Sequence, residues 1–339
     1  MPEPFLDVRD LTVRFRTRRG TVTAVDGLSF TVEEGEVLGI VGESGSGKSV
    51  SMMSLMRLIR DPNASVTGQA SFRGQDLLAL PEAQMRSLRG REIAMIFQDP
   101  MTSLTPVYTV GWQIAEQIRA HEKVTKKAAL ERAADLLGEV GIPDPARRLH
   151  QYPHEFSGGM RQRVMIAMAL SCSPALLIAD EPTTALDVTT QAQILDLLRQ
   201  LQAAHGSSVI LITHDMGVVS EIADRVLVMY AGRAAEQGPK SAVFRRPQHP
   251  YTWGLMDSIP RAGMDEKSEL CPIKGQPPSL VDVPSGCPFH PRCPYVRERC
   301  RAEVPALRDV RGGHRASCHF AGEPGFARGC SLELEPEAV

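Results

Sequence analysis

The sequence predicts an α/β protein with a mostly parallel sheet, followed by a small cysteine-rich module. Up to about residue 240, short apolar runs alternate with helical patterns. A glycine-rich loop joins one continuous apolar run to a helical stretch, and beyond residue 240 prolines and cysteines gather. Continuous apolar runs bounded by polar residues or glycine suit parallel strands that are covered on both faces.

Three of these runs are the predicted parallel strands: VLGIV at 37–41, ALLIAD at 175–180 and SVILIT at 208–213. Residues 21–37 instead alternate between polar and apolar, with Asp-Gly and Glu-Gly turn signals, and this pattern predicts an antiparallel flank. Residues 226–238 predict a hairpin that turns at Ala-Gly.

The stretch from about 99 to 155 has a mainly helical pattern, and we expect a helical subdomain there. KKAALERAADLLGEVG, at 126–141, ends with Gly141 where a helix C-cap is expected. A change in composition near residue 245 indicates a domain boundary. The predicted boundaries are 1–245 for the first domain, 246–325 for the second module and 326–339 for a flexible tail.

Composition and charge narrow the class of protein. The chain has 339 residues, 42% of them hydrophobic, with a formal net charge of −2. Charge alone therefore does not hold nucleic acid, and we expect no nucleic-acid partner. The N-terminus lacks the pattern of a secretory leader, and the longest apolar run, 164–179, is broken by Pro174. We expect a soluble or membrane-peripheral protein in the cytoplasm.

GESGSGKS, at 42–49, follows the run VLGIV and precedes the helical stretch SVSMMSLMRLI. A phosphate-binding G-x-x-x-x-G-K-[ST] loop requires this context; the alternative is an ordinary glycine-rich turn. The glycines let backbone N–H groups turn toward phosphate oxygens, and the helix N-terminus adds positive charge. Lys48 is expected at the β- and γ-phosphates, and Ser49 on Mg²⁺. The predicted nucleotide-binding loop is Gly42, Glu43, Ser44, Gly45, Ser46, Gly47, Lys48 and Ser49.

Polar residues follow the apolar strands. Asp180 and Glu181 end the run ALLIAD; Asp180 is expected to hold the Mg²⁺ shell and Glu181 to position the attacking water. Gln98 ends another apolar run, where its amide can sense Mg²⁺ or the water. His214 follows SVILIT, where its imidazole can hydrogen-bond the γ-phosphate. Taken singly, the acid pair could cap a helix and the histidine could be structural.

FSGGM, at 156–160, is a second glycine-rich helix start. Ser157, Gly158 and Gly159 predict another anion-binding helix end, and Ser157 is also a good N-cap. A chain that already has one phosphate loop needs a second only if it serves a nucleotide held by another subunit. We therefore expect a dimer with ATP at its interface, and Asp187, in TTALD, as a bridge between the subunits.

In order and approximate spacing, these residues resemble the ATP-binding subunits of ABC transporters, over about residues 5–240. Phe156 and Met160 stand where the commonest signature has Leu and Gln. Met160 followed by RQRV is similar to the branch that serves oligopeptide and dipeptide importers, although Thr105 stands where that branch often has Asn. Three longer stretches share this similarity: IFQDPMTSLTPVYTVGWQIAEQI at 96–118, DEPTTALDVTTQAQIL at 180–195 and HPYTWGLMDSIP at 249–260.

The resemblance implies a RecA-like P-loop NTPase core with an antiparallel β subdomain and a helical subdomain. It also implies two membrane permeases that dock beside Gln98, an extracellular substrate-binding protein, and a second ATP-binding subunit, commonly a different chain. The protein would lie on the cytoplasmic face of the membrane. Phe15 is the nearest candidate for the residue that stacks on adenine, but Arg19 falls close to the aligned position.

Four of the seven cysteines form a spaced group in the second module: Cys287, Cys293, Cys300 and Cys318. Their gaps of five, six and seventeen residues are wider than those of most structural zinc sites and fit a [4Fe–4S] cluster. In the peptide-importer branch, a similar stretch binds such a cluster in some members. The alternatives are Zn²⁺, with His290 or His319 as further ligands, and reduced structural thiols. Cys271 and Cys330 lie outside the spacing pattern.

Other functions stay open at this point. The same machinery could import nickel or sugars, or the chain could be a soluble ABC ATPase of DNA repair or translation. The latter usually carry two cassettes or a long coiled coil, and this sequence has one cassette and no sustained heptads. A P-loop kinase or GTPase would not explain FSGGM.

Overall fold

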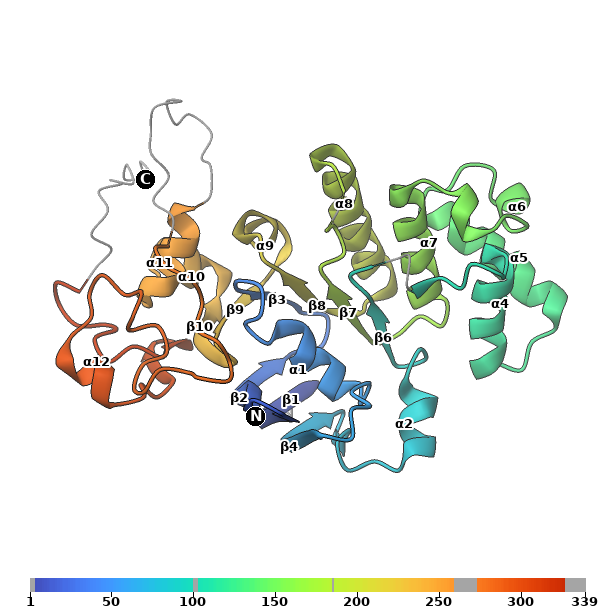
Figure 1. The fold of residues 1–339 in the computed structure, drawn as a ribbon. Coiled ribbons are helices and arrows are strands. Elements are labelled where there is room, and N and C mark those ends of the chain that lie inside the picture. Colours follow the sequence, from blue (N-terminus) through green and yellow to red (C-terminus); the bar gives the residue numbers. More distant parts are fainter. Residues whose placement is uncertain (1–3, 100–102, 185, 259–272, 327–339) are drawn as a thin grey trace, which may run out of the picture.

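The computed structural model describes residues 4–99, 103–184, 186–258 and 273–326 (Figure 1). Within these ranges the strands form an eight-stranded sheet, in the order β11-β12-β10-β9-β3-β8-β7-β6, and a four-stranded sheet, in the order β2-β1-β4-β5. The predicted tail beyond residue 326, Cys271 and Cys330 lie outside the described residues.

The eight-stranded sheet has a parallel centre and an antiparallel edge. Strands β6, β7, β8, β3 and β9 run parallel, and β10, β12 and β11 are antiparallel to their neighbours. Its strands are β3 (Val37–Val41), β6 (Ile93–Ile96), β7 (Leu176–Asp180), β8 (Ser208–Thr213), β9 (Arg225–Tyr230), β10 (Arg233–Pro239), β11 (Arg308–Arg311) and β12 (His314–Ala316). The three predicted parallel strands and the hairpin at Ala231-Gly232 are confirmed.

The four-stranded antiparallel sheet is the predicted flank, with one correction. It consists of β1 (Leu6–Thr17), β2 (Gly20–Val32), β4 (Ala64–Phe72) and β5 (Gln75–Asp76). The sequence predicts that the Asp-Gly pair at 26–27 turns the chain. Strand β2 instead continues through the pair, and its pairing with β1 shifts in register there. Gly27 has φ +64° and its N–H donates to Thr12 Oγ1 at 3.0 Å, so the pair bulges and does not turn.

Helices lie at both ends of the main sheet in Figure 1, with α4 to α7 grouped beyond β6 and α10 to α12 near β10. The helices are α1 (Lys48–Leu55), α2 (Glu82–Leu88), α4 (Val110–His121), α5 (Lys126–Glu139), α6 (Pro145–Arg148), η1 (Pro153–Glu155), α7 (Gly158–Leu170), α8 (Val188–His205), α9 (Met216–Ile222), α10 (Lys240–Arg245), α11 (Pro250–Asp257) and α12 (Glu298–Ala302). Helix α1 is shorter than the predicted stretch, because Arg57 adopts φ +50° just after it. Gly141, at φ +74°, follows the last turn of α5 as expected.

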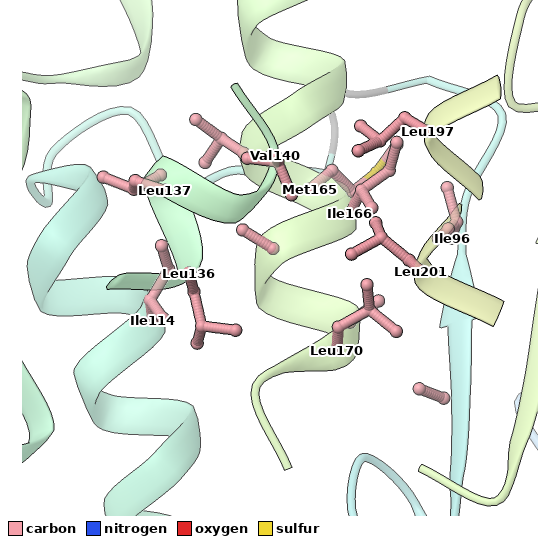
Figure 2. Packing of buried hydrophobic residues seen from close by; sticks show 14 of the residues in the cluster. Ile96, Ile114, Leu136, Leu137, Val140, Met165, Ile166, Leu170, Leu197 and Leu201 are labelled. Carbon is pink, nitrogen blue, oxygen red and sulfur yellow. The ribbon is translucent and has the colours of Figure 1, made fainter. Parts of the chain in front are cut away.

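The helical region is joined to the sheet by one continuous apolar core. Figure 2 shows side chains from α4, α5, α7, α8 and β6 meeting in it. The labelled members are Ile96, Ile114, Leu136, Leu137, Val140, Met165, Ile166, Leu170, Leu197 and Leu201. Burying each such side chain contributes about 2 kcal/mol, so this core fixes where α7 begins relative to the sheet.

The cysteine-rich module continues the main sheet. Strand β12 pairs with β10 through Glu236 opposite Ala316 and Gln237 opposite Arg315. Buried Glu236 also accepts a hydrogen bond from the N–H of His249 and contacts His314 Nε2 at 2.6 Å. The module is therefore anchored to the first domain by backbone pairing and by buried polar contacts. Among the described residues, every helix is too short or too polar to cross a membrane.

Candidate functional site

Parallel strands bring the predicted site residues to one edge of the sheet. The phosphate loop follows β3, Gln98 follows β6, Asp180 ends β7 with Glu181 next to it, and His214 follows β8. Because these strands are parallel and adjacent, their carboxyl ends meet at the same edge, which is where α/β proteins bind ligands.

The phosphate loop requires its glycines. Gly45 and Gly47 have φ of +78° and +97°. A Cβ on Gly47 would lie 2.3 Å from the Ala24 carbonyl oxygen, and one on Gly42 would lie 2.2 Å from the Met229 carbonyl oxygen. The backbone is therefore closely packed against β2 and β9, and only glycine fits at these positions.

The side chains of the loop leave hydrogen-bonding capacity for a ligand. Lys48 is buried, and its Nζ donates to the carbonyl oxygens of Gly42 at 2.7 Å and Glu43 at 3.0 Å. Burial lowers the pKa of Lys48, while the nearby carboxylates of Glu181 and Asp180 act in the opposite direction. Ser46 Oγ is buried without a hydrogen-bond partner. The loop thus offers the Lys48 ammonium to a ligand, and the shielded Ser46 hydroxyl keeps unused hydrogen-bonding capacity.

Asp180 and Ser49 form an oxygen pair behind the loop. Ser49 Oγ donates to Asp180 Oδ1 at 2.8 Å. The pKa of Asp180 is raised, because the effect of burial outweighs the opposing effect of the hydrogen bond from Ser49. A hydroxyl and a carboxylate in contact are ligands of the kind that Mg²⁺ prefers, so these residues fit the ion.

Glu181 is the centre of a polar cluster. Its Oε2 accepts hydrogen bonds from Gln98 Nε2 at 3.1 Å and Thr184 Oγ1 at 2.8 Å, and lies 3.5 Å from His214 Nδ1. Glu181 adopts φ +45°, an uncommon conformation for a residue with a side chain. The sequence placed Gln98, Glu181 and His214 at strand ends, but it gave no signal for Thr184, which reaches Glu181 through this turn.

A cavity of ≈ 750 Å³ opens at this edge of the sheet. It is lined by residues 43–50, Gln98, Glu181, His214, Leu255, Ser258 and Ile273. The last three belong to the second module, which was not expected at the nucleotide. Phe15 is half-buried against the core of the antiparallel sheet, and neither it nor exposed Arg19 lines the cavity.

The second glycine-rich turn lies elsewhere. Ser157 Oγ caps α7 by accepting from Met160 N at 3.4 Å, and Ser157 and Gly158 are exposed. None of Ser157, Gly158 and Gly159 lines the cavity. Asp187 caps α8, and its hydrogen bonds from Thr190 hold its pKa below the ordinary value. A Cβ on Gly159 would lie 2.9 Å from Thr190 Cγ2, so the starts of α7 and α8 are neighbours.

Cys287, Cys300 and Cys318 lie in an apolar cluster that the module shares with β9 and α9 of the first domain, and Cys293 packs against it. The pKa of Cys287 is raised to about 11 and that of Cys293 to about 12, chiefly by burial, and Cys300 and Cys318 act in the same direction. However, the described residues contain no group of three or more Cys, His, Asp or Glu side chains arranged to hold a metal ion. His290 Nδ1 and His319 Nε2 contact backbone carbonyls at 3.0 Å each. The described geometry therefore gives no support to the expected [4Fe–4S] cluster or to zinc.

Comparisons with known proteins identify what this chain resembles. The family model described as ABC transporter matches residues 25–184, and the one described as oligopeptide/dipeptide transporter, C-terminal region, matches residues 235–300. The dipeptide transport ATP-binding protein DppD of Escherichia coli K12 is 52% identical over 323 residues, covering 94% of this chain and 98% of that protein. DppD of Bacillus subtilis 168 is 53% identical, covering 93% and 94%.

Solved structures agree with the fold. A dimeric ATP-binding cassette in a post-hydrolysis state, bound to ADP and Pi, has a TM-score of 0.63 at 25% identity and covers 69% of this chain and 98% of its own. CbiO1 of Clostridium perfringens, part of an ABC transporter complex, has a TM-score of 0.60 at 28% identity and covers 72% and 91%. The expected P-loop fold is confirmed.

Proposed function

This chain belongs to the peptide-transport ATP-binding proteins of the ABC transporters, and we propose that it works as one half of a two-subunit ATPase. It is the ATP-hydrolysing subunit of a peptide importer. The observation that carries the mechanism is the meeting of the phosphate loop with Glu181, Gln98 and His214 around one cavity.

Each residue at the cavity takes a role that its contacts support. Lys48 leaves the carbonyls of Gly42 and Glu43 to bind the β- and γ-phosphates, and Ser49 and Asp180 would hold Mg²⁺, with Gln98 nearby. Such an ion would supply positive charge to offset that of the phosphates. Glu181 positions the attacking water and accepts its proton, as suits phosphoryl transfer, where placement and charge do most of the work.

His214 and Thr184 orient that carboxylate. Thr184 donates to Glu181 Oε2, which leaves Oε1 for the water. His214 is exposed at the mouth of the cavity, where its imidazole can reach the γ-phosphate. The cavity has no aromatic platform among its lining residues, so we assign no adenine-stacking residue within the described part of the chain.

The exposed turn of Ser157, Gly158 and Gly159 completes the site of a second ATP-binding subunit. Two observations support this: Ser157 and Gly158 are exposed at the start of α7, and neither lines the cavity formed by the phosphate loop. Asp187, at the start of the neighbouring helix, would lie at the same interface. We propose that the second subunit is a different chain, and that ATP closes the pair while hydrolysis through Glu181 reopens it.

The permease subunits dock beside Gln98. Exposed large apolar side chains lie close to Gln98 in sequence, at Phe97, Val107, Tyr108 and Trp112, and the rings of Tyr108 and Trp112 stack at 4.0 Å between centroids. An exposed apolar patch of this kind marks an interaction surface. We therefore place the chain on the cytoplasmic face of the membrane, with two permeases and, outside, a substrate-binding protein.

Reconstitution tests this function. The chain, its permeases and its binding protein in vesicles should hydrolyse ATP faster when a dipeptide or oligopeptide is supplied, and should accumulate it. The other importable solutes, nickel and sugars, serve as competitors. Stimulation by nickel or sugar and none by peptide would contradict the peptide assignment, and ATP hydrolysis without any solute movement would favour a non-transport ATPase.

The [4Fe–4S] cluster on Cys287, Cys293, Cys300 and Cys318 stays a proposal that rests on their spacing and shared burial. It predicts stoichiometric iron and acid-labile sulfide in protein purified without oxygen, both lost in Cys293→Ser. Zinc without sulfide would support the zinc alternative. Neither metal, with all four thiols titratable after denaturation, would show that they are structural.

A further inference from the structure

Glu43, the second residue of the phosphate loop, is held from the side of the cysteine-rich module. Its side chain pairs with Arg292, and its backbone N–H donates to the Tyr251 hydroxyl at 2.8 Å. Its carbonyl oxygen accepts from Lys48 Nζ at 3.0 Å. Glu43, whose carbonyl oxygen binds the Lys48 ammonium, is thus positioned by a part of the chain far from it in sequence.

The pair between Arg292 and Glu43 is bidentate and shielded. Arg292 Nη1 donates to Glu43 Oε2 at 2.6 Å, and Nη2 donates to Oε1 at 3.0 Å. The side chain of Arg292 is only 5% exposed and that of Glu43 is 27% exposed. Two parallel charge-assisted bonds of this kind fix orientation as well as distance, and loss of one partner leaves a poorly solvated charge.

Arg292 is itself fixed by the module. Its Nε donates to the Lys274 carbonyl at 3.1 Å, its Nη2 to the Gly275 carbonyl at 3.2 Å, and its guanidinium lies 5.9 Å from the Tyr230 ring centroid. The next residue is Cys293, which packs against the module's apolar cluster. The position of Arg292 therefore depends on how the module packs.

Helix α11 forms the second connection. Tyr251 is fully buried, and its N–H donates to His249 Nδ1 at 3.0 Å at the start of the helix. One to two turns further on, Leu255 and Ser258 line the nucleotide cavity, with Ile273 packed near Gly254. The module thus contacts the loop at Glu43 and also closes one side of the cavity.

We propose that Arg292 is a positioning residue for ATP binding, and that through Glu43 it lets the packing of the cysteine-rich module set the affinity of the phosphate loop for nucleotide. Lys48 Nζ rests on the carbonyls of Gly42 and Glu43, so a displaced Glu43 moves the place from which the ammonium reaches the phosphates. The inference rests on the ATPase activity of the chain, which the unmodified protein reports in the same assay.

The test compares Arg292→Ala with Arg299→Ala in the full-length chain assembled with its partner subunits. Arg299 is an arginine of the same module, but it pairs with Glu303 at the surface, with both side chains 58% exposed. We expect Arg292→Ala to raise the KM for MgATP about tenfold with kcat changed by less than about twofold, because loop placement acts mainly on binding. Arg292→Lys, which keeps the charge but not the fork, should fall between, and Arg299→Ala should match the unmodified protein.

A double-mutant cycle separates positioning from folding. Glu43→Gln and Arg292→Gln should each raise the KM, and the double variant should be no worse than the worse single one, because both remove the same interaction. A KM unchanged in Arg292→Ala, with only its melting temperature lowered, would overturn the proposal, as would additive effects in the cycle. If Arg292→Ala does not fold, Glu43→Gln and Arg292→Lys decide the question alone. If the unmodified assembly itself hydrolyses no ATP, the failure lies with the proposed function and not with Arg292.

Discussion

The phosphate loop and the Ser157 turn are both glycine-rich starts of helices, yet their surroundings differ. The loop is packed against β2 and β9, and it lines one cavity together with Glu181 and His214. The turn is exposed, and a Cβ on Gly158 would meet nothing within 4 Å. We therefore propose that the loop is an anion site completed by its own chain, and that the turn contacts a ligand held by another subunit. The same local chemistry would then have two uses, because the neighbours of the two segments differ.

The largest expected effect is the loss of ATP hydrolysis when Glu181, at the phosphate-loop cavity, is replaced. Glu181→Gln keeps the shape of the side chain but cannot accept a proton, so hydrolysis should fall at least about hundredfold. Binding of ATP should stay unchanged, since Lys48 and Ser49 are untouched. Steady-state hydrolysis and equilibrium nucleotide binding measure the two effects. Glu131→Gln, an exposed carboxylate on α5, is the control, and equal losses in both variants would remove the special role of Glu181.

A negative charge in the exposed Ser157 turn should affect hydrolysis in the assembled transporter and leave the phosphate loop of its own chain unchanged. Gly158→Asp places a carboxylate where the γ-phosphate of the partner's nucleotide is expected, so hydrolysis by the assembled transporter should fall roughly hundredfold. Stability and ATP binding by the isolated chain should not change, because the position is open and acidic residues suit a helix start. Normal hydrolysis in the assembled transporter would break the comparison.

Alanine substitutions in the phosphate loop and in the Ser157 turn should show how differently the two segments are packed. In Gly47→Ala, the φ of +97° and the close Ala24 carbonyl should cost about 2 kcal/mol of unfolding free energy and weaken ATP binding. Gly158→Ala, in open space, should change stability by less than about 0.5 kcal/mol. Denaturant unfolding of the two variants checks this. Equal losses would mean that the turn is as constrained as the loop.

Acid should lower the free energy of unfolding through His249, in the module that contacts the phosphate loop. Burial lowers the pKa of His249 to about 4, from an ordinary 6.5. The folded state therefore keeps His249 neutral while the unfolded state takes up a proton, so stability present above pH 6.5 is lost as the pH falls toward 4. Between pH 7 and 5.5 the loss should be about 1 kcal/mol.

Buried Trp253, on the helix that holds Glu43 through Tyr251, can report this loss. In Trp112→Phe the remaining tryptophan is Trp253, so its fluorescence follows denaturant unfolding of the module at each pH. His249→Asn keeps a cap acceptor but does not titrate, and should remove most of the pH dependence. An equally steep dependence in His249→Asn would assign the effect to another group.

Local sequence patterns predicted most of the residues that line the phosphate-loop cavity, but they did not predict contacts between distant segments. The loop is contiguous, and Gln98, Glu181 and His214 follow apolar runs, so parallel strand order alone brings them together. The pair between Glu43 and Arg292 joins residues 249 positions apart, and neither side chain carries a sequence signal for the other.

Two other features depended on three-dimensional packing in the same way. The Asp-Gly pair at 26–27 has the composition of a turn, but pairing with β1 carries β2 straight through it. Cysteine spacing indicated a metal, yet spacing does not fix the directions of the side chains, and the described residues hold no metal-binding group. Local composition was therefore informative about strands and loops, and silent about which segments pack together.

A structure of the assembled importer, with Glu181→Gln and ATP-Mg²⁺ trapped in the site, is the most direct measurement. A nucleotide on the Lys48 loop should contact the signature turn of the partner subunit through its γ-phosphate, and the turn at Ser157 and Gly158 should contact the partner's nucleotide in return. A trapped complex in which the Ser157 turn lies away from every nucleotide would contradict it.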